Sequence, residues 1–226
     1  MAFTFLLCDL DETLYPSRTG LMQAVTERIN RYMVEQMGFT PEVTQRLRRA
    51  YHEQYGTTMR GLIVNYGIDP ENYLAFVHDL PLERYLGPDP TLDEVLASIL
   101  LRKVVFTNAS REHAEGVLGI LGVRHHFERI IDVRDFQYHS KPDPLAYQRI
   151  LEILATTPEQ CIFVEDSLRN LTPARALGMA TVWVGDGRLL DTYSSPPADA
   201  HIESIHALAD AVWALIHPRG RGAAGE

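Results

Sequence analysis

Five short hydrophobic runs limit the folds that are open to this chain. They are rich in β-branched or aromatic residues, and they span Phe3–Cys8, Val104–Thr107, Arg129–Val133, Cys161–Val164 and Ala180–Val184. Continuous apolar runs of this length are typical of strands that are buried on both faces of a parallel sheet. Helical patterns separate the later runs, and the alternation predicts an α/β fold with a doubly wound, mostly parallel sheet.

The helical patterns between the later runs have recognisable ends. Ser110 can cap one helix, and Asp143-Pro144 supplies a cap and a first-turn proline for a second helix. A third helix is predicted over Leu171–Leu177, and we expect Pro173 to lie in its first turn, where proline is tolerated. Each predicted helix lies between two of the hydrophobic runs, as a crossover connection requires.

A long insert separates the first two hydrophobic runs. It holds about 90 residues, which is far more than a crossover connection needs, and an apolar helical face recurs over residues 21–37. We therefore predict a helical cap domain over 17–87, inserted into a discontinuous core formed by 1–16 and 88–226. The last part of that core, 218–226, is expected to be a disordered tail.

Charge and composition narrow the possible partners. With 46% hydrophobic and 23% charged residues the chain is globular in composition, and its formal net charge is −9. An acidic surface repels phosphate backbones and anionic lipids, so we expect neither nucleic acid nor membrane as a partner. A small phosphate ester remains possible where cationic groups are concentrated, and the composition leaves the oligomeric state open.

The cysteines and the N-terminal run indicate the compartment. Cys8 and Cys161 are too few for a disulfide framework, and both lie in apolar runs, where a buried reduced thiol is expected. The N-terminal run stops at Asp9, which makes it too short for a secretory segment, and no apolar stretch approaches the length of a membrane span. We expect a cytoplasmic protein.

Two aspartates directly follow the first predicted strand. In an extended segment residues i and i+2 point the same way, so Asp9 and Asp11 are expected to share one site. Two carboxylates at such a distance repel each other unless a cation lies between them. Mg²⁺ prefers oxygen ligands and leaves room for a substrate phosphate, and the pair therefore suggests a magnesium site.

Three further features lie at the ends of later strands. Thr107 and Asn108 can hold a phosphoryl oxygen just before a helix begins, and Lys141, between prolines, can neutralise phosphate or carboxylate charge. Glu165 and Asp166 form a second acidic pair after the fourth strand. Ligands of open α/β sheets bind beyond the carboxyl ends of the strands. All these residues are therefore expected at one site, whereas His125-His126 is interpreted as a solvated turn.

The order of these motifs resembles the haloacid dehalogenase superfamily of phosphotransferases. The resemblance covers nearly the whole chain, because the long helical insert is similar to the type-one cap of that superfamily. Several stretches are also similar to its pyrimidine 5′-nucleotidase subgroup, namely Leu10–Pro16, Tyr55–Leu62, Ile68–Leu74 and Gly87–Pro90. One departure is Asn170, where many members place a further aspartate, and this leaves open whether Glu165 or Asn170 joins Asp166 at the metal.

The resemblance implies a mechanism. Asp9 would attack phosphorus and form an aspartyl phosphate, while Asp11 would protonate the leaving alkoxide and later take a proton from water. Mg²⁺ would be held by Asp9, the backbone carbonyl of Asp11 and Asp166, with Glu165 beside them. The oxygens of the transferred group would be stabilised by Thr107, Asn108 and Lys141. Dehalogenation fits less well, because it has no leaving alkoxide that needs an acid.

The insert is expected to select the substrate, because the core supplies only phosphate chemistry. We predict that Arg60 hydrogen-bonds and Tyr55 stacks on a pyrimidine nucleoside 5′-monophosphate, although a surface ion pair and a packed aromatic ring would be equally consistent with the sequence. A phosphatase or mutase of sugar phosphates is the alternative. A non-catalytic phosphate-binding domain is disfavoured, because pure binding does not need both Asp9 and Asp11.

Overall fold

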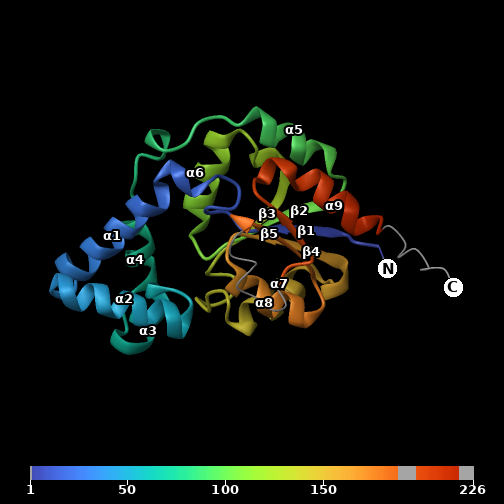
Figure 1. Ribbon diagram of the computed structural model, residues 1–226. Coiled ribbons are helices and arrows are strands. Elements are labelled where there is room, and N and C mark those ends of the chain that lie inside the picture. Colours follow the sequence, from blue (N-terminus) through green and yellow to red (C-terminus); the bar gives the residue numbers. More distant parts are fainter. Residues whose placement is uncertain (1, 188–196, 219–226) are drawn as a thin grey trace.

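The computed structural model describes residues 2–187 and 197–218. In this part of the chain one parallel sheet has six strands in the order β3-β2-β1-β4-β5-β6, which confirms the predicted doubly wound α/β fold (Figure 1). The strands are β1 (Phe5–Cys8), β2 (Arg102–Phe106), β3 (Phe127–Ile131), β4 (Cys161–Glu165), β5 (Ala180–Val184) and β6 (Ala200–Ile202).

Helices cover both faces of the sheet. On one face lie α5 (Pro90–Ser98), α6 (Arg111–Leu121) and α9 (Leu208–Ile216), and on the other lie α7 (Pro144–Leu154) and α8 (Leu168–Leu177). Alternate residues of β1 pack against opposite layers: Leu6 and Cys8 belong to the first core cluster, and Phe5 and Leu7 to the second. The strands are therefore buried on both sides, as their continuous hydrophobic runs predict.

The predicted helix caps are confirmed. The hydroxyl of Ser110 accepts a hydrogen bond from the backbone N–H of His113 at 3.3 Å, and Asp143 Oδ1 accepts one from Leu145 at 3.0 Å. The prediction for Pro173 is wrong, because α8 begins directly after Ser167 and carries the proline in its interior. At that position proline has no N–H to donate to the helix.

The strand predictions also need corrections. Residues Phe3 and Thr4 do not join β1, and β3 runs over Phe127–Ile131 instead of Arg129–Val133. The short strand β6 was not predicted; its three residues are too few to show a period, and only pairing with β5 makes them a strand. Both cysteines are buried and unpaired, and burial raises the pKa of Cys8 to about 12.

Four helices form the insert and lie together beside the sheet in Figure 1. They are α1 (Leu21–Glu35), α2 (Pro41–Tyr55), α3 (Thr58–Tyr66) and α4 (Pro70–Val77). The separate helix α3 was not predicted; it follows Gly56, whose positive φ of 84° ends α2, and Thr57 then caps α3. The domain boundaries at 17 and 87 stay predictions. Of the expected tail, residues 219–226 lie outside the described residues.

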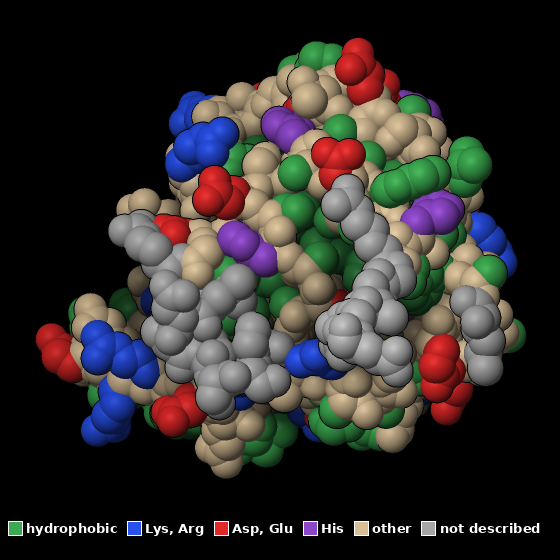
Figure 2. Space-filling view, turned by 45° about the vertical axis from the view of Figure 1, so that its right-hand side comes forward, with side chains coloured by type: hydrophobic (Ala, Val, Ile, Leu, Met, Phe, Trp, Pro, Cys, Tyr) green, Lys and Arg blue, Asp and Glu red, His purple; other side chains and the backbone are tan. Residues whose placement is uncertain are grey.

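The surface mixes side chains of different kinds. On the face seen in Figure 2, acidic and basic side chains are interspersed with hydrophobic ones. Among the described residues, no helix combines the length and the apolar character that crossing a bilayer requires.

Candidate active site

Lys141 is the centre of the candidate site. Its buried Nζ donates to Asp9 Oδ1 at 2.6 Å, to Glu165 Oε2 at 2.9 Å and to the carbonyl oxygen of Phe106 at 2.7 Å. These acceptors follow or end β1, β4 and β2, so the three protons of the ammonium group join three neighbouring strand ends. Burial alone would lower the pKa of Lys141, but the two carboxylates outweigh burial and raise it. Lys141 therefore stays charged.

Three carboxylates surround this lysine. Ligand oxygens of Asp9, Glu165 and Asp166 all lie within 4.8 Å of one another. The hydroxyl of Thr13 lies 3.1 Å from Asp9 Oδ2 and 3.3 Å from Asp166 Oδ1, and it accepts a hydrogen bond from the N–H of Asp166 at 3.0 Å. Burial and the charge of Glu165 raise the pKa of Asp9 to about 7 and that of Asp166 to about 10. In the absence of a cation these two carboxyl groups therefore tend to hold protons, and only the fully ionised cluster carries more negative charge than Lys141 balances.

Glu165 lies near the carboxylates of Asp9 and Asp166, and it also orients Lys141. Its Oε1 accepts from the N–H of Ser167 at 3.1 Å, and its Oε2 accepts from Lys141 and, at 3.0 Å, from Asn170 Nδ2. The side-chain amide of Asn170 thus holds the carboxylate of Glu165 in place.

Asp11 lies outside the group formed by Asp9, Glu165 and Asp166. Its Oδ1 accepts hydrogen bonds from Tyr15 Oη at 2.6 Å and from His113 Nε2 at 2.8 Å. Asp9 and Asp11 nevertheless line the same cavity, as expected for two residues that share one site. Burial raises the pKa of Asp11, but His113 and Tyr15 outweigh burial, and the pKa is lowered.

Thr107 and Asn108 lie at the end of β2, beside Lys141. Asn108 Oδ1 accepts from the N–H of Lys141 at 2.8 Å, and Asn108 Nδ2 donates to the carbonyl of Lys141 at 3.2 Å. The hydroxyl of Thr107 accepts from the N–H of Ala109 at 3.0 Å. The Asn108 side chain therefore fixes the backbone of Lys141, a role that sequence reasoning did not anticipate.

A cavity of about 530 Å³ opens between this cluster and the insert. Asp9, Asp11, Thr107, Asn108, Glu165 and Asp166 all line it. The lining also includes Arg48 and His52 of α2 and Arg169 of α8, whose guanidinium donates to the carbonyl oxygens of His52 and Glu53. Arg48 Nη1 donates to Asn30 at 2.9 Å, while its Nε has no hydrogen-bond partner among the described residues. The lining of the cavity thus combines carboxylates of the core with the guanidinium groups of Arg48 and Arg169.

The structure does not bring Arg60 and Tyr55 to this cavity. Arg60 Nη2 lies 3.4 Å from the ring nitrogens of His139, and the ring of Tyr55 packs edge-on against Tyr51 at 5.8 Å. Neither side chain lines the cavity beside Asp9. The substrate contacts of Arg60 and Tyr55 stay predictions, whereas Arg48 of the same insert does line the cavity.

Sequence reasoning missed Tyr15 and His113. Tyr15 lies one helical turn beyond Asp11, a spacing that could have indicated the contact. His113 lies 102 positions from Asp11 and meets it only because α6 follows the strand beside β1. His78 of the insert stacks on His113 with ring centroids 4.4 Å apart. Only the tertiary structure reveals this pair.

Comparison with known proteins places this architecture in a family. The model of the haloacid dehalogenase-like hydrolases matches residues 4–178. Phosphate metabolism protein 8 of Saccharomyces cerevisiae is 29% identical over 192 residues, which cover 77% of this chain and 59% of that protein. Fructose-1-phosphate phosphatase YqaB of Escherichia coli is 35% identical over 86 residues, which cover 38% of this chain and 44% of that enzyme. The chain spans about half the length of these two relatives.

A solved structure has the same fold. The HAD-hydrolase YfnB from Bacillus subtilis, bound to magnesium, aligns with a TM-score of 0.57 at 19% identity, over 94% of this chain and 99% of that one. The family match covers most of the chain, and it includes β1, β2 and β4, whose ends carry Asp9, Thr107 and Glu165. This chain therefore belongs to the haloacid dehalogenase-like hydrolase family.

Proposed function

We propose that this protein is a phosphomonoesterase in which Asp9 is the nucleophile. The observation that carries the proposal is the contact of 2.6 Å between Asp9 Oδ1 and Lys141 Nζ at the edge of the cavity. A nucleophilic carboxylate has to be ionised and oriented, and a buried lysine beside it serves both needs. The second lysine contact, to Glu165, keeps Nζ in place when Asp9 changes charge.

The proposed reaction has two steps. An oxygen of Asp9 bonds to phosphorus as the ester P–O bond breaks, and the leaving alkoxide takes a proton from Asp11. Water then attacks the aspartyl phosphate, gives its proton to Asp11, and releases phosphate with the Asp9 carboxylate restored. Thr107, Asn108 and Lys141 are the proposed donors to the phosphoryl oxygens.

The environment of Asp11 fits the second step directly. Its lowered pKa keeps it ionised and ready to accept a proton from water. In the first step it must carry a proton, and a bound phosphate dianion favours that state because a nearby negative charge raises the pKa of a carboxyl group. His113 and Tyr15 hold Oδ1 in either state.

The donor set fits Mg²⁺. The oxygens of Asp9, Glu165 and Asp166 are hard ligands within 4.8 Å of one another, and their charge exceeds that of Lys141. Asp9, Asp166 and the backbone carbonyl of Asp11 are the proposed ligands, with Glu165 beside them. When bound, Mg²⁺ would neutralise negative charge on the carboxylates and on the phosphate. The magnesium reported for YfnB is consistent with this proposal.

A pyrimidine nucleoside 5′-monophosphate is the proposed substrate class. The similarity of Leu10–Pro16 and Ile68–Leu74 to the pyrimidine 5′-nucleotidase subgroup supports it. A cavity of about 530 Å³ has the size of a small-molecule site, and Arg48 and Arg169 offer donors for base carbonyls or ribose. Sugar phosphates are the second candidate, which the similarity to fructose-1-phosphate phosphatase favours.

One assay tests both the proposed mechanism and the proposed substrate class. Phosphate release is measured with Mg²⁺ on UMP, CMP, AMP, fructose 1-phosphate and p-nitrophenyl phosphate, for the wild type and Asp9→Asn. We expect Asp9→Asn to fall to background on every ester, and kcat/KM to be highest for the pyrimidine nucleotides. Substantial turnover by Asp9→Asn contradicts the covalent mechanism. A preference for fructose 1-phosphate overturns the nucleotide assignment alone, and a need for added bisphosphate indicates a mutase.

A further inference from the structure

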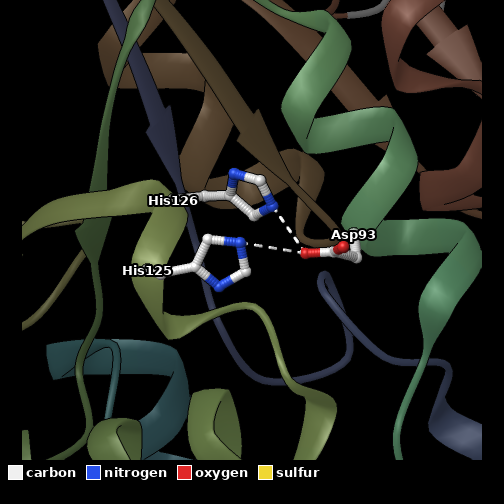
Figure 3. A group of neighbouring side chains, drawn as sticks. All are labelled: Asp93, His125 and His126. Carbon is white, nitrogen blue, oxygen red and sulfur yellow. Dashed lines mark hydrogen bonds and ion pairs between the residues drawn. The ribbon is translucent and has the colours of Figure 1, made fainter.

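Two adjacent histidines and an aspartate converge on the surface away from the Asp9 cluster. His125 and His126 lie in the 3₁₀ turn before β3, and Asp93 lies in the first turn of α5 (Figure 3). The Nε2 atoms of both imidazoles face the same carboxylate oxygen, Asp93 Oδ1, at 3.2 Å for His125 and 2.7 Å for His126. The solvated-turn interpretation therefore holds for His125, with 64% of its side chain exposed, but not for His126, with 12% exposed.

The backbone around these side chains is held in place independently of them. Arg124 donates to Glu115 Oε2 at 2.5 Å and to the carbonyl oxygen of Phe127 at 2.7 Å, which fixes both ends of the 3₁₀ turn. The N–H of His126 donates to the carbonyl of Val123 at 3.1 Å. On the other side, Asp89 caps the helix that carries Asp93. The three side chains are thus presented by two rigid elements.

The donor set belongs to the transition metals. Two imidazole nitrogens and one carboxylate oxygen suit Zn²⁺, Co²⁺, Ni²⁺ or Cu²⁺, whereas Mg²⁺ and Ca²⁺ prefer sites made of oxygen. Around a tetrahedral ion with bonds of ~2.0–2.1 Å, ligand atoms lie roughly 3.3 Å apart. To admit such an ion, the observed 3.2 Å for His125 would open by about 0.1 Å and the observed 2.7 Å for His126 by about 0.6 Å. The exposed side of His125 leaves room for water as a further ligand.

We propose that Asp93, His125 and His126 bind a divalent transition metal ion of the zinc class. The two histidines lie 32 and 33 positions from Asp93 in the sequence, so a bound ion joins α5 to the turn that leads into β3. Because α5 is the first element of the core after the insert, the ion would stabilise the point where the chain re-enters the sheet. This site uses none of the residues of the proposed phosphatase reaction.

Metal binding to the full chain tests the proposal without an activity readout. The protein is stripped with EDTA, dialysed into millimolar Mg²⁺ near neutral pH, and titrated with Zn²⁺ by calorimetry and with Co²⁺ by visible absorption. The variants Asp93→Asn and His126→Gln remove ligands, and His217→Gln is the control because it removes an exposed histidine of the α9 C-terminus. Any Zn²⁺ that binds to the Asp9 cluster should still bind in all three variants, so it is counted separately.

We expect the wild type to bind one equivalent of Zn²⁺ at this site. Asp93→Asn and His126→Gln should each weaken this binding, and His217→Gln should leave it unchanged. The loss should reach at least ~10- to 100-fold in affinity, since removing an outer-shell partner alone costs that much. The Zn²⁺-induced rise in melting temperature should disappear with it. Failure of the wild type to bind this equivalent at Zn²⁺ up to about 100 μM overturns the proposal. Unchanged binding by both ligand variants overturns it equally, and shows that the three side chains form ion pairs only.

Discussion

Removing a single oxygen from Tyr15 should expose the acid–base role of Asp11. Tyr15 is buried, and its hydroxyl donates to Asp11 Oδ1 at 2.6 Å, while His113 donates to the same oxygen at 2.8 Å. In Tyr15→Phe the ring still fills its place in the core, so Asp11 loses one of its two donors and keeps the other. The variant therefore perturbs the orientation of Asp11 without removing its carboxylate.

The expected magnitude follows from the charge on the acceptor. A hydrogen bond to a charged group contributes ~1.5–3 kcal/mol, which corresponds to about 10- to 150-fold in rate when it is made fully in the transition state. In the proposed mechanism the ester P–O bond of an alkyl phosphate breaks with a proton from Asp11, so kcat/KM for such an ester should fall by a factor in this range. p-Nitrophenolate leaves without a proton, so kcat/KM for p-nitrophenyl phosphate should change little.

The control for this prediction is a tyrosine that makes the same kind of hydrogen bond to a carboxylate outside the cavity. Tyr138 donates to Glu71 Oε1 at 2.6 Å, and neither residue lines the cavity beside Asp9. Tyr138→Phe should leave both substrates unaffected, and urea unfolding of both variants shows whether stability has changed. An equal loss on alkyl and aryl phosphates in Tyr15→Phe would refute the reasoning, because a general effect on folding or phosphate binding does not depend on the leaving group.

Three further predictions concern the metal, the insert and pH. Excess EDTA should abolish activity and Mg²⁺ restore it, with Ca²⁺ a poor substitute because its coordination is larger and looser; full activity after chelation would contradict the site. Gly56→Ala should raise KM, because a Cβ there would collide with the carbonyl of Lys141 and push the insert away, whereas Gly38→Ala, at a position with open space, should not. Burial and the neighbouring His113 lower the pKa of His78 to about 3, so below pH 6.5 the unfolded chain binds a proton that the native chain does not. Stability should therefore fall by about 2 kcal/mol between pH 7 and pH 5 on account of His78, and urea unfolding of His78→Asn should lack this part of the pH dependence.

Sequence patterns predicted these core elements well, because each element depends on interactions between residues that are close together in the sequence. The runs around β1, β4 and β5 and the caps Ser110 and Asp143 depend on neighbours within a few residues. The strand-end rule also indicated correctly that Asp9 and Lys141 meet, although they lie 132 positions apart. These predictions succeeded because a parallel sheet brings the ends of its strands together whatever their separation in sequence.

Other parts of the site depend on contacts that no local pattern encodes. Arg48 and Arg60 lie on neighbouring helices of the insert, and only the packing of α2 and α3 decides that Arg48 faces the cavity. The same holds for His113, which reaches Asp11 from another layer of the fold. The hydrogen bonds that Tyr15 and His113 donate to Asp11 Oδ1 were likewise not predicted, because the period of a strand says nothing about partners from other elements.

The charge of the site links the metal to the nucleophile. Asp9, Glu165 and Asp166 together carry three negative charges when ionised, and Lys141 supplies one positive charge. A phosphate dianion that enters this site meets an unbalanced negative charge, and each pair of unit charges at 4 Å costs about 4 kcal/mol at an effective dielectric constant near 20. Burial, followed by the charge of Glu165, raises the pKa of Asp9 to about 7. A divalent cation would therefore serve two needs at once: it would admit the phosphate, and it would keep Asp9 in the ionised form that the proposed attack on phosphorus requires.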